Sequence, residues 1–442
     1  FVFLLFIYLF FFSDRFLSVN SGVGSSFSLF ILDFSSKMEI LGSIKSYEWG
    51  KSGKNSKVAQ LALKHDENFR REFNETTPYA ELWMGDHVSG PSSVKSSGQS
   101  LAKVIADDNS LIGGMPALPF LFKVLSIEKP LSIQVHPNKE QAERLNAIRP
   151  DLYKDPNHKP EIAIALTDFV ALCGFRKSAE IYNLLTKIEL RPLSNLIGAE
   201  LVEQLHSQPG NDSIKKCYTK LMHSPEKEIT LCIVELASNL MLGDFHFFGQ
   251  MFEIFQHCNH YFPNDIGVLS IFFLNIVQMK PGQAIYLAAN EPHAYLSGDC
   301  IECMACSDNV IRAGLTPKFK DVETLLEMLD FSGKTVDEKF FEPVDIGPYS
   351  KLFKPPVKDF AVVQVKVPKN VHSCSIENRS FGSIIIVLRG YANAAFKGQH
   401  LFDLKEGSIV FIPASIKSLS LTFNHFDDDK GFIAYQALYN DF

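Results

Sequence analysis

The fold of this chain is decided by a stretch that occurs twice, as Met279-Lys-Pro-Gly-Gln-Ala-Ile-Tyr-Leu-Ala-Ala-Asn290 and, without gaps, as Leu404-Lys-Glu-Gly-Ser-Ile-Val-Phe-Ile-Pro-Ala-Ser415. In both copies Lys-x-Gly precedes an apolar strand that ends on Ala and a small polar residue. A turn glycine leading into an apolar strand, found twice, predicts two related β-barrels or jelly rolls. The copies differ further on, where His293 follows the first and Ser418 stands at the aligned position of the second. If one barrel holds a metal ion, we expect it to be the first.

The region before the first copy has mainly β character. From residue 38 to about residue 178, short apolar runs are punctuated by Gly, Pro and Ser, which is typical of β-strands and turns. We expect one helix to interrupt this region, because Asn138 can cap it and Gln141 lies three residues further on, as in a capping box.

A helical insertion is predicted between the β regions. From residue 178 to about 261 the apolar residues have helical periodicity and no strand alternation. The segment 242–255 is unusually apolar for a surface helix. After Pro263 the β character returns and lasts to the C-terminus, apart from a helix predicted at 322–329.

The first 37 residues differ from the rest of the chain. Ten of its 38 Phe residues precede Met38, and the apolar run 1–12 is too short to span a bilayer comfortably. A signal peptide would begin with a basic segment, whereas the first basic residue here is Arg15. The Phe/Ser/Leu bias is typical of a pyrimidine-rich untranslated leader read in frame. We therefore hypothesise that residues 1–37 are not native and that Met38 is the true start; the alternative is a cleaved targeting segment.

Composition excludes some classes of partner and compartment. A net charge of −7 argues against a nucleic-acid or membrane partner, and eight scattered cysteines in 442 residues indicate a reduced, cytoplasmic protein. Cys300, Cys303 and Cys306 resemble a metal cluster, but in a strand Cys303 would point away from the other two. We interpret them as core thiols.

One predicted strand carries polar side chains on a single face. In Pro130-Leu-Ser-Ile-Gln-Val-His-Pro137, strand periodicity groups Ser132, Gln134 and His136 and turns the aliphatic residues to the other side. Such a face is often simply exposed to solvent. Three other segments favour a site: Glu161 opens an apolar run, His293 and Tyr295 share one side of an extended stretch, and a loop marked by Gly and Pro holds Asp308, Arg312 and Lys318. Two histidines, a carboxylate and an amide oxygen can complete a four-ligand zinc site, although Gln is an uncommon ligand.

Five motifs resemble those of the type I, cupin-type, zinc-dependent mannose-6-phosphate isomerases. They are Tyr79-Ala-Glu-Leu-Trp-Met-Gly85, Gln134-Val-His-Pro-Asn-Lys139, His158-Lys-Pro-Glu161, Asn290-Glu-Pro-His-Ala-Tyr-Leu296 and Ile301-Glu-Cys-Met-Ala-Cys-Ser-Asp-Asn-Val-Ile-Arg-Ala-Gly-Leu-Thr-Pro-Lys318. The resemblance runs from about Gly42 to the C-terminus and implies interconversion of mannose 6-phosphate and fructose 6-phosphate, which feeds GDP-mannose synthesis.

The resemblance also implies a site. Gln134, His136, Glu161 and His293 match the ligands of one Zn²⁺ per chain. Arg312 matches the active-site arginine, and Tyr295, Glu302, Asp308, Lys159, Ser132 and Lys318 match positions associated with the substrate. We take Arg312, Tyr295, Asp308, Glu302 and Lys159 as catalytic candidates and Ser132, Lys318 and Arg312 as substrate-binding candidates. The proton-shuttling base remains open among Asp308, Glu302, Tyr295 and Lys159.

The implied fold is a mainly β bicupin, two jelly-roll barrels plus a helical domain. We expect a metal-binding cupin domain over 38–178 and 262–335, a helical domain over 179–261, and a second cupin domain without a metal over 336–442. The substrate is a small sugar phosphate, and we expect a monomer. The rival functions are a cupin oxygenase or epimerase, which would use the same two His and carboxylate with iron, and a sugar-binding storage protein with a degenerate site.

Overall fold

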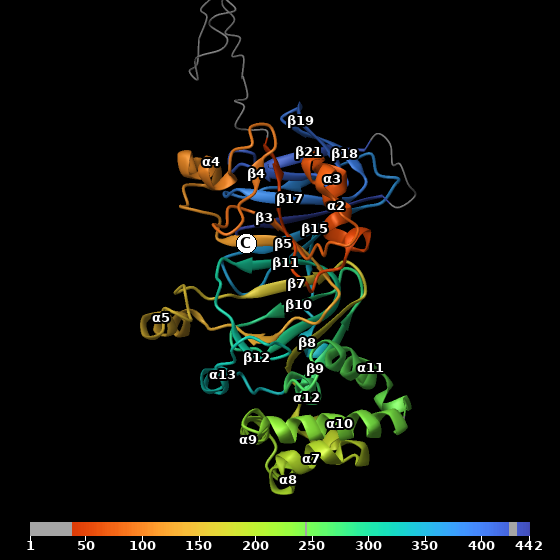
Figure 1. Cartoon of the computed structure of the whole chain (residues 1–442). Coiled ribbons are helices and arrows are strands. Elements are labelled where there is room, and N and C mark those ends of the chain that lie inside the picture. Colours follow the sequence, from red (N-terminus) through yellow and green to blue (C-terminus); the bar gives the residue numbers. More distant parts are fainter. Residues whose placement is uncertain (1–37, 244, 424–430) are drawn as a thin grey trace, which may run out of the picture. The chain divides into compact units, whose positions relative to one another are not determined.

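The computed structural model describes residues 38–243, 245–423 and 431–442. The hypothesised leader 1–37 therefore lies outside the described residues. Among those that are described, no helix is both long and apolar enough to cross a membrane. The chain is rich in β-strands, with a run of helices inserted between them, as the periodicity predicts (Figure 1).

A ten-stranded antiparallel sheet contains the predicted site segments. Its longest path has the order β10-β7-β11-β5-β3-β2, while β6 joins β11 to β12 and β8 joins β11 to β9. The strands are β2 (Ser43–Lys45), β3 (Glu81–Met84), β5 (Phe120–Ile127), β6 (Ile133–Val135), β7 (Glu161–Ala165), β8 (Phe169–Phe175), β9 (Leu274–Met279), β10 (Ala284–Leu287), β11 (His293–Ala305) and β12 (Ile311–Gly314). The long strand β11 is thus the central element, because it pairs with β5, β6, β7 and β8.

Two further sheets come mainly from the C-terminal region. The eight-stranded sheet has the order β13-β14-β15-β22-β17-β20-β1-β4, and the four-stranded sheet has the order β16-β21-β18-β19. The strands are β1 (Met38–Leu41), β4 (Ser93–Val94), β13 (Val344–Gly347), β14 (Ser350–Phe353), β15 (Ala361–Val367), β16 (Ser373–Glu377), β17 (Ser383–Arg389), β18 (Tyr391–Phe396), β19 (Gln399–Lys405), β20 (Ile409–Ile412), β21 (Ser418–Thr422) and β22 (Phe432–Leu438). The N-terminal strand β1 joins the eight-stranded sheet by pairing with β20 on one side and with β4 on the other.

The ten-stranded sheet separates two environments by strand alternation. On β7, Ile162 and Ile164 belong to a core shared with the eight-stranded sheet, whereas Ala163 and Ala165 belong to another cluster, on the opposite face, together with Tyr295. Alternate residues of a strand point to opposite faces. The sheet therefore packs one apolar face against the C-terminal strands and turns Glu161, Ala163 and Ala165 to its other face, where the alanines leave room.

The two copies of the repeat form the same local structure. Gly282 and Gly407 both have a left-handed backbone, with φ of 93° and 87°, a conformation that favours glycine. The strands that follow, β10 and β20, occupy aligned positions, and His293 and Ser418 are the first residues of β11 and β21. The predicted turn and strand are confirmed in both copies.

The helices fall into two groups. Those outside the insertion are α2 (Lys57–His65), α3 (Glu67–Glu72), α4 (Leu101–Asp107), α5 (Lys139–Ile148) and α13 (Val322–Met328). Those of the insertion are α6 (Ser178–Leu185), α7 (Arg191–Ile197), α8 (Ala199–Ser207), α9 (Asn211–Met222), α10 (Glu226–Leu242) and α11 (Phe245–Tyr261), followed by α12 (Gly267–Ser270). Short 3-10 turns lie at Gly53–Asn55, Asn109–Ile112, Ile188–Leu190 and Asp337–Lys339.

The expectation of a single helix before residue 178 was wrong. The capping box of Asn138 and Gln141 is present at the start of α5, and α13 also lies where it was predicted. However, α2, α3 and α4 precede them. The helix α2 is capped by Ser56, whose hydroxyl accepts a hydrogen bond from the backbone N–H of Ala59. These helices have two or three turns at most, too few for periodicity to separate them from short strands.

The apolar segment 242–255 is explained in part by packing. Phe248 and Phe255 of α11 are buried in the large core that joins the insertion to β6, β8 and β9. The side chains of residues 244–247 lie outside the described part of the chain.

Of the three clustered cysteines, Cys300 and Cys303 are buried as predicted, whereas Cys306 is half-buried and follows β11. All eight are free. Cys300 and Cys303 lie on opposite faces of β11, because each belongs to a different apolar cluster. They are core thiols, as predicted.

Candidate active site

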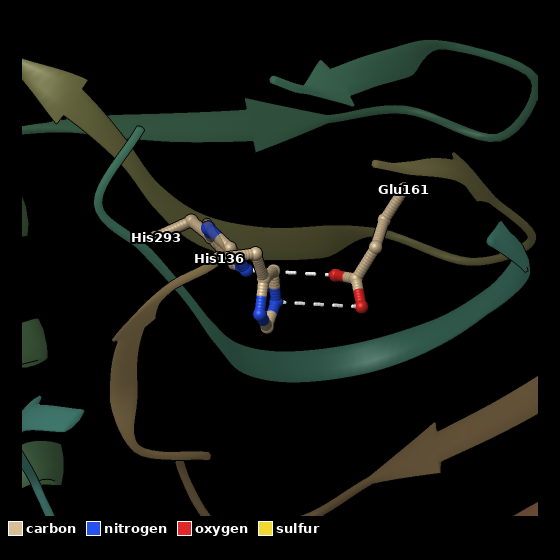
Figure 2. A group of neighbouring side chains, drawn as sticks. All are labelled: His136, Glu161 and His293. Carbon is tan, nitrogen blue, oxygen red and sulfur yellow. Dashed lines mark ion pairs between the residues drawn. The ribbon is translucent and has the colours of Figure 1, made fainter. Parts of the chain in front are cut away.

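Three buried side chains from segments of the ten-stranded sheet lie close together. His136 directly follows β6, Glu161 opens β7 and His293 opens β11. The Nε2 atoms of His136 and His293 lie 3.5 Å from Oε1 and Oε2 of Glu161, respectively (Figure 2). Each residue is only 1% exposed. Residues 157 positions apart in the sequence are thus brought together by the pairing of strands.

Backbone carbonyls determine how both imidazoles face the carboxylate. Nδ1 of His136 lies 2.7 Å from the carbonyl oxygen of Asn309, and Nδ1 of His293 lies 2.9 Å from that of Glu291. A carbonyl can only accept, so each Nδ1 must carry the proton and donate it. When the ring is neutral, its Nε2 then presents a lone pair to Glu161.

In this arrangement the Nε2 lone pairs of the neutral imidazoles face the carboxylate oxygens of Glu161, and both kinds of atom are hydrogen-bond acceptors. Among the described residues, both Nε2 atoms and Oε2 of Glu161 are buried without a hydrogen-bond partner. Burial, and next the charge of Lys159, lower the pKa of His136 to about 4, so Nε2 of His136 carries no proton to donate to Glu161 at neutral pH. A buried acceptor without a partner is costly. A cation bound by His136, Glu161 and His293 would satisfy all three, and these residues form a possible metal-ligand group.

The carboxylate is held in its charged form. Burial by itself raises the pKa of Glu161, but Lys159 and His136 hold it well below its ordinary value. The ammonium of Lys159 lies 3.1 Å from Oε1 of Glu161. An ionised carboxylate and neutral imidazoles are the protonation states that metal binding requires.

Strand register places two more predicted residues beside this group. Gln134 pairs with His293 on one side and with Arg312 of β12 on the other. Residues directly opposite each other in antiparallel strands project from the same face. His293, Gln134 and Arg312 therefore form a row across three strands, next to the carboxylate.

Two further candidates lie on β11. Tyr295 follows His293 by two residues, and their ring centres are 6.4 Å apart. Burial, and then the carboxylates of Glu302 and Glu161, raise the pKa of Tyr295 well above its ordinary value, so the phenol keeps its proton. Glu302 is buried on the same face of the sheet as Glu161, since it pairs with Ala163. Its pKa is raised by burial, with Lys123 opposing and Glu161 adding to the shift.

The remaining candidates lie farther out. Asp308 and Lys318 are exposed, and Ser132 is half-buried just before β6. The backbone N–H of Asp308 donates to Asp155, while its carboxylate raises the pKa of His87 and thereby only partly offsets the lowering caused by burial.

Lys123 is a buried charged residue beside the site that was not predicted from the sequence. This lysine lies in the middle of β5, where it forms ion pairs with Glu302 at 2.9 Å and with Glu81 at 3.4 Å. Its ammonium also lies 5.2 Å from the centre of the Trp83 ring. A charged residue inside Phe120-Leu-Phe-Lys-Val-Leu-Ser-Ile127 is the signal that was available, because a lysine in a buried strand must be paired.

Comparisons with known proteins show the family to which the chain belongs. The family model of the phosphomannose isomerase type I catalytic domain matches residues 38–178, and that of the helical insertion domain matches residues 194–274. Mannose-6-phosphate isomerase of Bos taurus is 41% identical over 400 residues, covering 86% of this chain and 93% of that protein. The chain belongs to the type I phosphomannose isomerase family. The predicted resemblance is confirmed.

Solved structures of phosphomannose isomerases share its fold. A variant of the enzyme from Salmonella typhimurium superposes with a TM-score of 0.78 at 31% identity, covering 92% of this chain and 100% of that one. A mannose 6-phosphate isomerase bound with zinc and yttrium gives a TM-score of 0.78 at 30% identity, with the same coverage.

Proposed function

We propose that this phosphomannose isomerase family member interconverts mannose 6-phosphate and fructose 6-phosphate, and that it supplies mannose metabolism and GDP-mannose synthesis. The observation that carries the proposal is the buried group of His136, Glu161 and His293, with acceptors facing acceptors and Arg312 in register beside it. Neither a solvent-facing strand nor a storage protein requires this arrangement.

We further propose that the group holds one Zn²⁺, with Gln134 as the fourth ligand. In a tetrahedral site with bonds of about 2.0–2.1 Å, ligand atoms lie roughly 3.3 Å apart. The two contacts of 3.5 Å between imidazole and carboxylate are close to that value. Bound zinc would supply Lewis-acid polarisation of the sugar carbonyl. Two neutral imidazoles, a neutral amide and one carboxylate leave the centre with a net positive charge, which favours an anionic intermediate.

Arg312 is proposed to bind the oxygens of the reacting sugar. A guanidinium donates in a planar fork to carboxylate-like or phosphate oxygens, and its place opposite Gln134 directs it toward the metal centre. Ser132 directly precedes β6, and Lys318 follows β12 by four residues. We propose that these two residues bind the phosphate.

We propose Glu302 as the group that moves the proton between C1 and C2. A general base needs a pKa drawn toward neutrality, and burial raises that of Glu302. Lys123 holds its charged form in place by an ion pair. Tyr295, which keeps its proton, is the donor candidate, and Lys159 positions Glu161. Asp308 is exposed and is the weakest of the four.

We also propose a bicupin fold, with the metal-binding domain over 38–178 and 262–335, the helical domain over 179–261 and a second domain without a metal over 336–442. The repeated turn and strand support this division. A monomeric, cytoplasmic protein fits the free cysteines and mild net charge.

The decisive experiment is metal analysis together with an isomerase assay on protein that begins at Met38. We expect one zinc per chain and oxygen-independent conversion of mannose 6-phosphate. Glu302→Gln should keep its zinc and lose turnover by about 10²–10⁴-fold, the range of general acid–base catalysis. Redox-active iron with oxygen uptake would instead support the oxygenase, and sugar binding without turnover would support the storage protein.

A further inference from the structure

The turn at residues 155–157, which precedes Glu161, is hydrogen-bonded to the loop at residues 307–309, which precedes Arg312. The carboxylate of Asp155 accepts the Ser307 hydroxyl on Oδ1 at 2.9 Å and the Asp308 backbone N–H on Oδ2 at 2.8 Å. The side-chain amide of Asn309 donates to the backbone oxygens of Asp155 and Asn157, at 2.7 and 2.9 Å. We call this set of contacts the Asp155 clasp.

The clasp ends on a metal-ligand candidate. Asn309 supplies the carbonyl oxygen that accepts from Nδ1 of His136. Ser307 and Asn309 are 3% and 2% exposed, so water does not compete for these contacts. The Asp155–Asn157 turn also leads directly to Lys159 and Glu161. The same turn thus leads along the chain to Glu161 and contacts Asn309, whose carbonyl oxygen orients His136.

We propose that Asp155 is a positioning residue of the metal centre: its carboxylate fixes the Ser307–Asn309 loop so that Asn309 sets the tautomer and direction of His136. The inference rests on the proposed metal binding of the site. Partners that orient a ligating histidine typically change metal affinity by about 10–100-fold when they are removed.

The clasp depends on the charge of Asp155 and on its two carboxylate oxygens, each of which accepts a hydrogen bond from the loop. In Asp155→Asn one oxygen can still accept from Ser307, but the new amide donor faces the N–H of Asp308. The side-chain amide of Asn309 keeps its contacts to two backbone oxygens, and it also lies 3.4 Å from Oδ1 of Asp155, the oxygen that the variant retains. We therefore expect the loop to stay folded but to shift at Asn309.

The test compares Asp155→Asn with Asp151→Asn. Asp151 lies four residues away, is exposed and pairs with Arg149, so it matches the change in charge without touching the loop. The zinc Kd is measured by chelator competition, and the imidazole ¹⁵N shifts of His136 are measured in the metal-free protein. In Asp155→Asn we expect a Kd about 10–100-fold higher and loss of the single Nδ1–H tautomer. In Asp151→Asn both should match wild type.

An unchanged Kd and tautomer in Asp155→Asn would overturn the inference. If that variant does not fold, Ser307→Ala is used instead. It removes the hydroxyl that donates to Asp155 and accepts from the backbone N–H of Asn309, and it keeps the Asp308 contact. It should raise the Kd several-fold, and an unchanged value there would equally refute the inference. A wild-type protein without isomerase activity refutes the proposed function instead, because the tautomer is measured without metal or substrate.

Discussion

The two copies of the repeat form the same turn and strand, yet only one leads into a polar site. After β10 the chain enters β11 at His293, where its neighbours contribute Gln134 and Glu161. After β20 it enters β21 at Ser418, which pairs with Glu377. One of the two strands beside β20 is β17, whose segment Ile384–Ile386 is wholly buried and apolar. A shared local pattern therefore sets the backbone, whereas the chemistry is set by the residues on neighbouring strands.

The largest effect is expected from replacing His293, the histidine that follows the first copy of the repeat. His293→Ala removes one of two imidazoles from the buried group, so we expect loss of zinc and a fall in isomerase activity of about 10³-fold or more, since a metal supplies several kcal/mol to the transition state. Metal analysis and steady-state kinetics measure both. A variant that keeps full zinc content and turnover would show that the ligand assignment is wrong.

Lowering the pH should destabilise the metal-free protein through His136. Burial and Lys159 lower the pKa of His136 to about 4, below the ordinary value of about 6.5. Between these values the unfolded chain binds a proton that the folded chain does not. The free energy of unfolding therefore falls as the pH falls through this window, by at most about 3 kcal/mol. Urea unfolding at pH 7 and pH 4.5 measures it. His136→Gln should lose this part of the pH dependence, and equal slopes in the two proteins would contradict the assignment.

The two turn glycines should respond differently to the same substitution. A left-handed residue with a side chain costs about 1–2 kcal/mol of folding free energy. Gly282→Ala should lose little more than that, because the new Cβ would have its nearest neighbour, Nε2 of Gln364, at 3.6 Å. At Gly407 a methyl group would lie 2.5 Å from the carbonyl oxygen of Leu61. Gly407→Ala should cost about 1–3 kcal/mol more, as overpacking does. Chemical denaturation of both variants tests this, and equal losses would show that the two turns are packed alike.

The smallest effect is expected at the aligned position of the second copy. Ser418→Ala should leave zinc content and isomerase activity unchanged and alter the free energy of unfolding by less than about 0.5 kcal/mol, as surface substitutions usually do. The same metal analysis and denaturation apply. Loss of zinc in this variant would mean that the second copy takes part in the site.

Local patterns were enough for some features and insufficient for others. The capping box of α5, the alternation around Gln134 and the repeated glycine turn were all readable, because each depends on residues within a few positions of one another. The short helices α2 to α4 were missed for want of length. Lys123 was missed because its partners Glu81 and Glu302 are distant in the sequence and only β-sheet pairing places them beside it.

By itself the sequence determined the residue types of the site, the short strand that carries Gln134 and ends just before His136, and the difference between His293 and Ser418. Only the tertiary structure decided that His136, Glu161 and His293 face one another with unpartnered acceptors, and that Asn309 and Glu291 set the two imidazoles. The reason is physical. Periodicity reports which face of an element a side chain takes, but distances between elements follow from strand register, which long-range pairing and packing determine.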